Sequence, residues 1–131
     1  KSSFKKIIRN YYFYLFFRFY YYINNIMTEE NWIEVGKTDS IDMEDLIRFD
    51  HSGKTFCVYR IEDGFYATDG MCTHEAVHLE DGLVMDDEIE CPMHQGIFNI
   101  KTGEAISPPA CEDLKTYPVK VENDLVYINI S

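Results

Sequence analysis

Two short Cys/His pairs constrain this chain more than any other feature. One residue separates Cys72 from His74, two separate Cys91 from His94, and residues 75–90 lie between the pairs. Each pair offers one thiolate and one imidazole, which are both common metal ligands. Each pair also lies at the end of a short apolar run. We therefore expect two neighbouring hairpin loops to converge on one metal centre.

Zinc is one interpretation, because two Cys and two His can close a tetrahedral site. The ligand order argues against it, since zinc fingers usually pair Cys with Cys and His with His at wider spacings. Four unrelated core residues are a second alternative, disfavoured by two matching pairs in adjacent turns. In a Rieske-type 2Fe-2S centre, two Cys bind one iron and two His bind the other. This centre is the favoured prediction, with ligands Cys72, His74, Cys91 and His94.

The remainder of the chain from Trp32 onward has the pattern of an all-β domain. Short apolar runs alternate with turn residues at intervals of about 8–12 positions. Turns such as His51-Ser52-Gly53 and Lys101-Thr102-Gly103 favour hairpins and antiparallel pairing. The stretch Ser107-Pro108-Pro109-Ala110 is expected to be a loop. The expected strands are 32–35, 46–49, 55–61, 65–68, 83–85, 88–90, 97–99, 116–122 and 125–130.

Charge divides the chain into two parts. Residues 1–26 hold five basic and no acidic residues, whereas residues 27–131 hold seven basic and 23 acidic ones, a formal charge of −16. The acidic part disfavours nucleic acid and anionic lipid and favours basic protein partners. Residues 1–26 are rich in residues encoded by AT-rich codons. We therefore expect 1–26 to be a non-native or disordered extension and 27–131 to be the functional domain.

A membrane anchor in the extension is the alternative. The aromatic and apolar stretch from Tyr11 to Ile23 is interrupted by Arg18 and is shorter than the roughly 20 residues that a membrane helix needs. Attachment to a membrane is therefore not expected. Metal-bound thiolates suit a reducing compartment, which predicts a cytoplasmic protein.

The segment from Met71 to Val119 resembles the ferredoxin component of Rieske non-haem iron oxygenase systems, such as those for naphthalene-type aromatic compounds. The runs CTHEAVHLEDG, CPMHQGIFNIKTGEAISPP and LKTYPVKVE occur in that family's order and spacing. The resemblance implies the Rieske fold, with three antiparallel sheets and a cluster-binding subdomain at one tip. It also implies one 2Fe-2S cluster per chain, two histidines at the surface, and the Pro108-Pro109 loop covering a third side.

The resemblance implies an electron carrier and not an enzyme. Its partners would be a flavin-containing or ferredoxin-type reductase linked to NAD(P)H and a terminal oxygenase. The chain is too short to add a substrate domain with a mononuclear iron site. The alternative function is the Rieske-like small subunit of an assimilatory nitrite reductase.

Several residues near the motifs are expected to be structural. Cys57 lies within an apolar strand and is expected to be a buried free thiol, and Cys111 is expected to be inert. His78 and His51 are interpreted as polar loop and turn residues. High-potential Rieske proteins have an additional Cys in each cluster loop and a Ser and a Tyr that hydrogen-bond the sulfurs. The corresponding positions here are Val77, Met93, Ile97 and Phe98. The absence of those Cys, Ser and Tyr residues predicts a reduction potential low in the Rieske range of about −150 to +300 mV.

Overall fold

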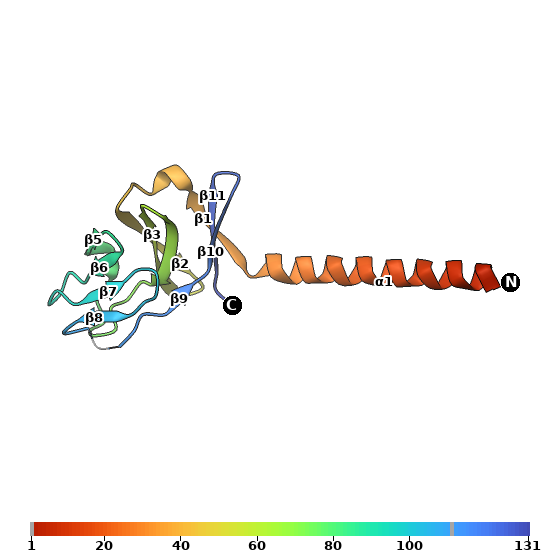
Figure 1. Ribbon diagram of the computed structural model, residues 1–131. Coiled ribbons are helices and arrows are strands. Elements are labelled where there is room, and N and C mark those ends of the chain that lie inside the picture. The colour runs from red at the N-terminus through yellow and green to blue at the C-terminus, as the bar shows by residue number, and fades with distance from the viewer. Residues whose placement is uncertain (1, 111) are drawn as a thin grey trace. The chain divides into compact units, whose positions relative to one another are not determined.

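The computed structural model describes residues 2–110 and 112–131. It divides into two compact units, an N-terminal helical unit and a β domain that runs from Ile33 to Ile130. The β domain contains one three-stranded and two four-stranded sheets (Figure 1). The strand pairs whose register is described are all antiparallel. The predicted fold class is confirmed, with the helix as an addition to it.

The sheets are built from eleven strands in the described residues. The first sheet has the order β1-β11-β10, the second β2-β3-β4-β9 and the third β5-β6-β7-β8. The bounds are β1 Trp32–Lys37, β2 Asp45–His51, β3 Lys54–Ile61, β4 Gly64–Asp69, β5 Leu83–Met85, β6 Glu88–Glu90, β7 Ile97–Asn99, β8 Ala105–Ser107, β9 Thr116–Tyr117, β10 Val119–Glu122 and β11 Leu125–Asn129.

Two of the sequence-based strand predictions were wrong. The expected strand 116–122 is divided into β9 and β10 at Pro118, which has no N–H to donate to a ladder. Strand β8 was missed, and Ser107, expected in a loop, pairs with Ile97 of β7. The three residues of β8 are half-buried or exposed, so they show no strong apolar pattern.

Strand β3 lies between two hydrophobic cores because its side chains alternate between the faces of the sheet. Cys57, Tyr59 and Ile61 belong to the core that also contains Leu79, Ile89 and Phe98 of the third-sheet region. Phe56 and Val58 belong to the other core, with residues of β11 such as Val126 and Ile128. Alternation along one strand therefore joins the second sheet to both other sheets.

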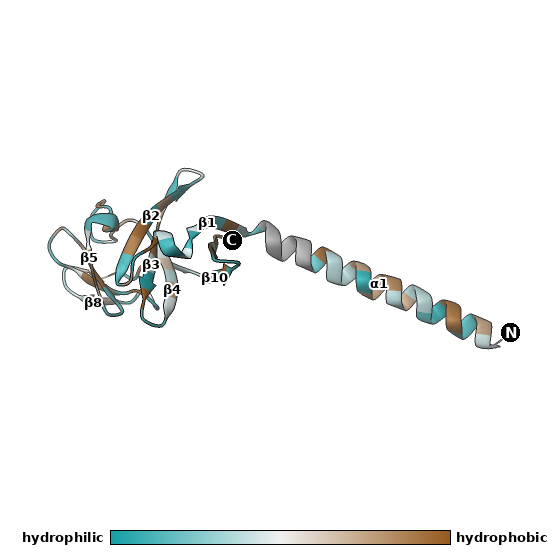
Figure 2. Ribbon diagram, turned by 90° about the horizontal axis from the view of Figure 1, so that it is seen from above, coloured by the Kyte–Doolittle hydropathy of each residue, from teal (hydrophilic) through white to brown (hydrophobic). Residues whose placement is uncertain are grey.

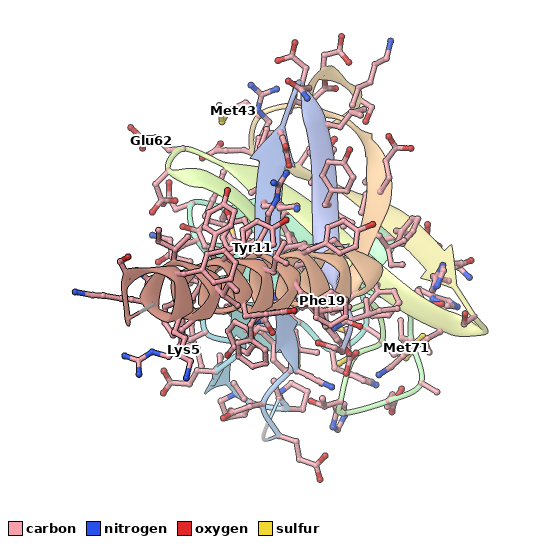
Figure 3. All side chains as sticks on the ribbon, turned by 90° about the vertical axis from the view of Figure 1, so that its right-hand side faces the viewer. Lys5, Tyr11, Phe19, Met43, Glu62 and Met71 are labelled. Atoms are coloured by element: carbon pink, nitrogen blue, oxygen red, sulfur yellow. The ribbon has the colours of Figure 1, made fainter. Side chains whose placement is uncertain are left out.

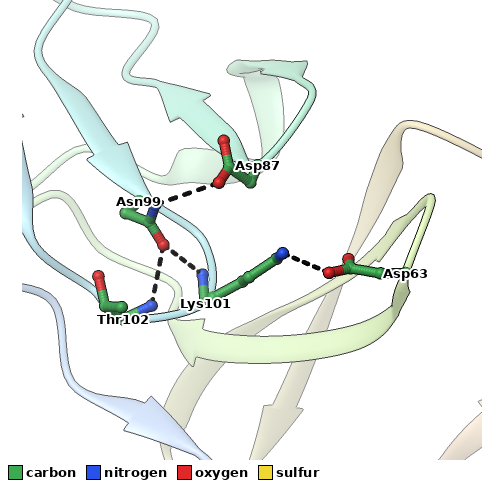
Figure 4. A network of polar contacts seen from close by, with 5 residues as sticks. All are labelled: Asp63, Asp87, Asn99, Lys101 and Thr102. Atoms are coloured by element: carbon green, nitrogen blue, oxygen red, sulfur yellow. Dashed lines mark hydrogen bonds and ion pairs between the residues drawn. The ribbon is translucent and has the colours of Figure 1, made fainter.

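Polar contacts also connect the second and third sheets (Figure 4). The Asn99 Oδ1 atom accepts hydrogen bonds from the backbone N–H groups of Lys101 (2.9 Å) and Thr102 (3.0 Å). The Asn99 amide also donates to Asp87 in the β5–β6 turn at 3.4 Å. The Lys101 ammonium contacts Asp63 in the β3–β4 turn. The network thus fixes the turn after β7 against two other turns.

The helical unit consists of α1 (Ser2–Glu30). The segment 2–30 contains no Gly or Pro, the two residues that most disfavour a helix interior. Apolar and polar residues are interspersed along it (Figure 2), and Lys5, Tyr11 and Phe19 are among the side chains that project from it (Figure 3). No helix within residues 2–110 and 112–131 has the length and apolarity needed to cross a membrane. The domain boundary at Met27 stays a prediction.

Candidate metal centre

The first cluster loop, residues 70–79, follows β4 and is closed by backbone hydrogen bonds. The Gly70 N–H donates to Thr55 O at 2.8 Å, and the Leu79 N–H donates to Gly70 O at 2.9 Å. Within the loop, the Cys72 N–H donates to Val77 O at 2.8 Å. A side chain at Gly70 would approach Thr55 Cγ2 to 2.5 Å, so the close contact with β3 requires glycine. These bonds fix the base of the loop on the second sheet.

The second cluster loop, residues 91–96, connects β6 to β7. The Cys91 N–H donates to Gly96 O at 2.8 Å, which closes the loop at its base. His94 and Gln95 have φ angles of +65° and +60°, a conformation uncommon for residues other than glycine. This tight turn positions His94 at the exposed end of the loop while Cys91 stays buried.

The segment after β8 contacts both loops. A Cβ atom on Gly96 would lie 3.0 Å from Ala110 Cβ, so the backbone of the second loop packs closely on Ala110. The hydroxyl of Thr73, in the first loop, donates a 2.6 Å hydrogen bond to Glu112 O. The expectation for Cys111 lies outside the described residues. Ala110 and Glu112, on either side of Cys111, therefore each contact one of the two loops.

Each loop contributes one residue to a buried cysteine pair and one residue to an exposed histidine pair. Cys72 and Cys91 are 6% and 2% exposed and belong to one hydrophobic core. Burial, with a smaller effect from the neighbouring Cys72 thiol, raises the pKa of Cys91 to about 11. The imidazole rings of His74 and His94 lie 5.8 Å apart between centroids and are nearly perpendicular. Their side chains are 32% and 57% exposed.

Glu75 is a residue of this site that the sequence reasoning missed. Its Oε1 atom lies 3.5 Å from His94 Nε2 and 4.0 Å from His74 Nε2. The ligand-capable atoms of His74, Glu75 and His94 lie within 4.8 Å of one another. An acidic residue directly after the first histidine was the available signal, but its contact with the second loop cannot be read from one sequence.

The other Cys and His residues lie outside this arrangement. Cys57 is a fully buried free thiol on β3, as predicted, and burial raises its pKa to about 12. His78 pairs with Met71 in a short β-bridge and has a buried Nδ1 atom without a hydrogen-bond partner among the described residues. His51 ends β2 and stacks near Phe49 at 6.2 Å. The ligand prediction needs none of these three residues.

Comparison with known proteins identifies the family. A model described as the Rieske [2Fe-2S] domain matches residues 31–118, two thirds of the chain. The chain belongs to the Rieske 2Fe-2S family. It is 43% identical to the ferredoxin component of the naphthalene 1,2-dioxygenase/salicylate 5-hydroxylase systems of Ralstonia sp., over 77% of this chain and 97% of that protein. It is 41% identical to the naphthalene 1,2-dioxygenase ferredoxin component of Pseudomonas aeruginosa, covering 78% and 98%.

Solved structures agree with this assignment. The ferredoxin in a complex of reduced oxygenase and oxidised ferredoxin of carbazole 1,9a-dioxygenase superposes with a TM-score of 0.73 and 35% identity. The match covers 76% of this chain and 93% of that one. The chain is thus a Rieske 2Fe-2S ferredoxin, an electron-transfer protein and not itself an enzyme. The similarity supports the electron carrier over the nitrite reductase subunit.

Proposed function

We propose that this ferredoxin carries single electrons from an NAD(P)H-linked reductase to the terminal oxygenase of an aromatic-ring dioxygenase system. Cys72, Cys91, His74 and His94 hold its cluster. The observation that carries the assignment is the pairing of two buried thiols with two exposed imidazoles on neighbouring loops. When bound, a Rieske cluster accepts and releases one electron, at a higher potential than an all-Cys centre because two neutral imidazoles replace two thiolates.

The donor set of the two loops fits this cluster. Thiolates suit iron-sulfur chemistry, and the hydrophobic core around Cys72 and Cys91 limits access of water to their sulfurs. Because the Cys91 pKa is raised to about 11, its thiol releases a proton when it binds metal. A mononuclear ion held by His74, Glu75 and His94 would leave both thiols without a role. The complete set of four ligands therefore favours the cluster.

The exposed imidazoles give electrons a short path to a partner protein. His74 and His94 stand at the surface, and the loops that hold them are braced by backbone hydrogen bonds and by the Thr73 contact with Glu112. The charge of −16 over residues 27–131 favours fast, salt-sensitive encounters with basic surfaces on the partners. A flavin-containing or ferredoxin-type reductase and an oxygenase with such surfaces are the partners that we propose.

Single-residue variants test the ligand assignment. In Cys72→Ser, His74→Ala, Cys91→Ser and His94→Ala, we expect loss of the iron-sulfur absorption and of acid-labile sulfide. Cys57→Ala and His51→Ala are matched controls, because they remove the same chemical groups from strands β3 and β2, outside both cluster loops, and should keep the cluster. Retention of a normal cluster by any one of the four ligand variants would overturn its assignment.

Reconstitution tests the electron route. The purified ferredoxin should link NADH oxidation by a dioxygenase-type reductase to product formation by its oxygenase, and His94→Ala should abolish that coupling. Raising the salt concentration should slow the transfer because it screens the acidic surface. Efficient coupling to an assimilatory nitrite reductase, with none to any aromatic-ring oxygenase, would favour the alternative function.

A further inference from the structure

The carboxylate of Glu75 lies between the two exposed histidines of the site. It is 3.5 Å from the Nε2 atom of His94, which belongs to the other loop, and 4.0 Å from that of His74. Both distances exceed the roughly 2.7–3.2 Å of ordinary hydrogen bonds, so the carboxylate makes no such bond to either ring. The Glu75 side chain is 44% exposed, so water and salt reach its charge.

Backbone hydrogen bonds of the first loop fix the main chain of Glu75. The Val77 N–H donates to Glu75 O at 2.7 Å, and the Cys72 N–H donates to Val77 O at 2.8 Å. Glu75 is thus joined through two successive hydrogen bonds to the backbone of a proposed ligand. The position is that of an ordered loop residue directly after His74.

Among the described residues, no Lys or Arg side chain lies within ion-pair distance of this carboxylate. In the described residues, Lys and Arg side chains within ion-pair distance of a carboxylate contact other acids, as Arg48 does with Asp50 and Glu80. The groups within ion-pair distance of Glu75 are the two imidazoles. The negative charge at the histidine end of the site is therefore uncompensated.

We propose that Glu75 is a positioning residue of the electron-transfer site that lowers the reduction potential of the cluster through its charge. The inference rests on the proposed function, because it requires His74 and His94 to be ligands. A carboxylate near the ligating imidazoles opposes the negative charge that reduction adds, and so favours the oxidised state. Glu75 thereby sets the potential at which this ferredoxin passes its electron to a partner.

The midpoint potential of the intact ferredoxin tests the proposal. Glu75→Gln keeps the size and an acceptor oxygen but removes the charge, and should raise the potential. We expect a change of about threefold to tenfold in the one-electron equilibrium constant, where tenfold corresponds to about 59 mV. Glu75→Asp keeps the charge on a shorter side chain and should give a potential between those of the wild type and Glu75→Gln.

Glu122→Gln is the matched control. It removes the same charge from β10, in a sheet that carries neither cluster loop, where Glu122 is 63% exposed and lies 3.7 Å from Lys120. Its potential should equal that of the wild type. The difference between Glu75→Gln and the wild type should also shrink as salt is added, which a packing defect would not produce.

The outcomes separate this proposal from the one on which it rests. If the wild type and Glu75→Gln hold intact clusters with equal potentials, or if Glu122→Gln shifts the potential as much, the role of Glu75 is wrong and the ligand assignment is unaffected. A wild-type protein with no 2Fe-2S cluster, or His74→Ala and His94→Ala variants that keep one, would overturn the proposed function itself.

Discussion

The hydroxyl of Thr73 donates a 2.6 Å hydrogen bond to the backbone carbonyl of Glu112, 39 residues later in the chain. Thr73 stands between two proposed ligands, so this bond joins the first cluster loop to the segment after β8. Thr73→Val keeps the shape of the side chain and removes the donor. We expect faster cluster loss on heating and about 0.5–1.5 kcal/mol lower stability.

Thr73→Ser is the control for that substitution, because it restores the hydroxyl. The half-life of the visible absorption at raised temperature is the measurement. Equal half-lives for the Val and Ser variants would show that the bond does not brace the loop.

Gly103 permits a sharp turn after β7 that no other residue fits. Its φ angle is +77°, and an added Cβ atom would collide with the carbonyl oxygen of Leu114. The Leu114 N–H also donates to Gly103 O at 2.8 Å, so the two backbones cannot separate without losing that bond. Gly103→Ala should lower the free energy of unfolding by roughly 2–4 kcal/mol, measured by urea denaturation.

Gly53→Ala separates the two causes of this destabilisation. Gly53 has a φ angle of +76° but nothing within 4 Å of an added Cβ atom. Gly53→Ala should lower the free energy of unfolding by only about 1 kcal/mol, which is the conformational part of the cost. If both variants lose the same stability, the collision with Leu114 plays no part.

The buried thiol of Cys57 makes the free energy of unfolding fall as pH rises through the alkaline range. Burial raises its folded-state pKa to about 12 from an ordinary value of 9.0. Between these values the unfolded chain loses the proton and the folded chain keeps it. The contribution of Cys57 to the free energy of unfolding is therefore fully present below pH 9.0. It declines as pH rises towards 12, by at most about 1.4 kcal/mol per pH unit.

Cys57→Ala should reduce that slope, as measured by urea unfolding at pH 8 to 11. Truncation lowers the overall stability at every pH, so the comparison concerns slopes and not absolute values. Identical slopes in the wild type and the variant would contradict the role assigned to this thiol.

Removal of residues 1–26 tests the predicted domain boundary. The four proposed ligands and the strands of the described residues lie beyond residue 31. Helix α1 and the β domain form separate compact units. A protein that starts at Met27 should therefore keep its cluster content, measured as iron and acid-labile sulfide per chain. If the truncated chain folds but assembles no cluster, the helical segment is needed for cluster assembly and this prediction is wrong.

Much of this site could be predicted from the sequence because the information is local. Cys72 and His74 belong to one short loop, Cys91 and His94 to another, and flanking apolar runs identified the strands that carry them. Contacts between distant segments could not be predicted in the same way. The approach of Glu75 to His94 and the bond from Thr73 to Glu112 depend on loop geometry that no residue pattern encodes.

Electron paramagnetic resonance of the dithionite-reduced protein, with iron and sulfide analysis of the same sample, tests the central claim most directly. We expect a red-brown protein with two iron and two sulfide per chain, as the 2Fe-2S centre requires, and a signal whose mean g lies below the free-electron value. His94→Ala should abolish the normal signal. Stoichiometric zinc with neither iron nor acid-labile sulfide in the wild-type protein would contradict the cluster assignment.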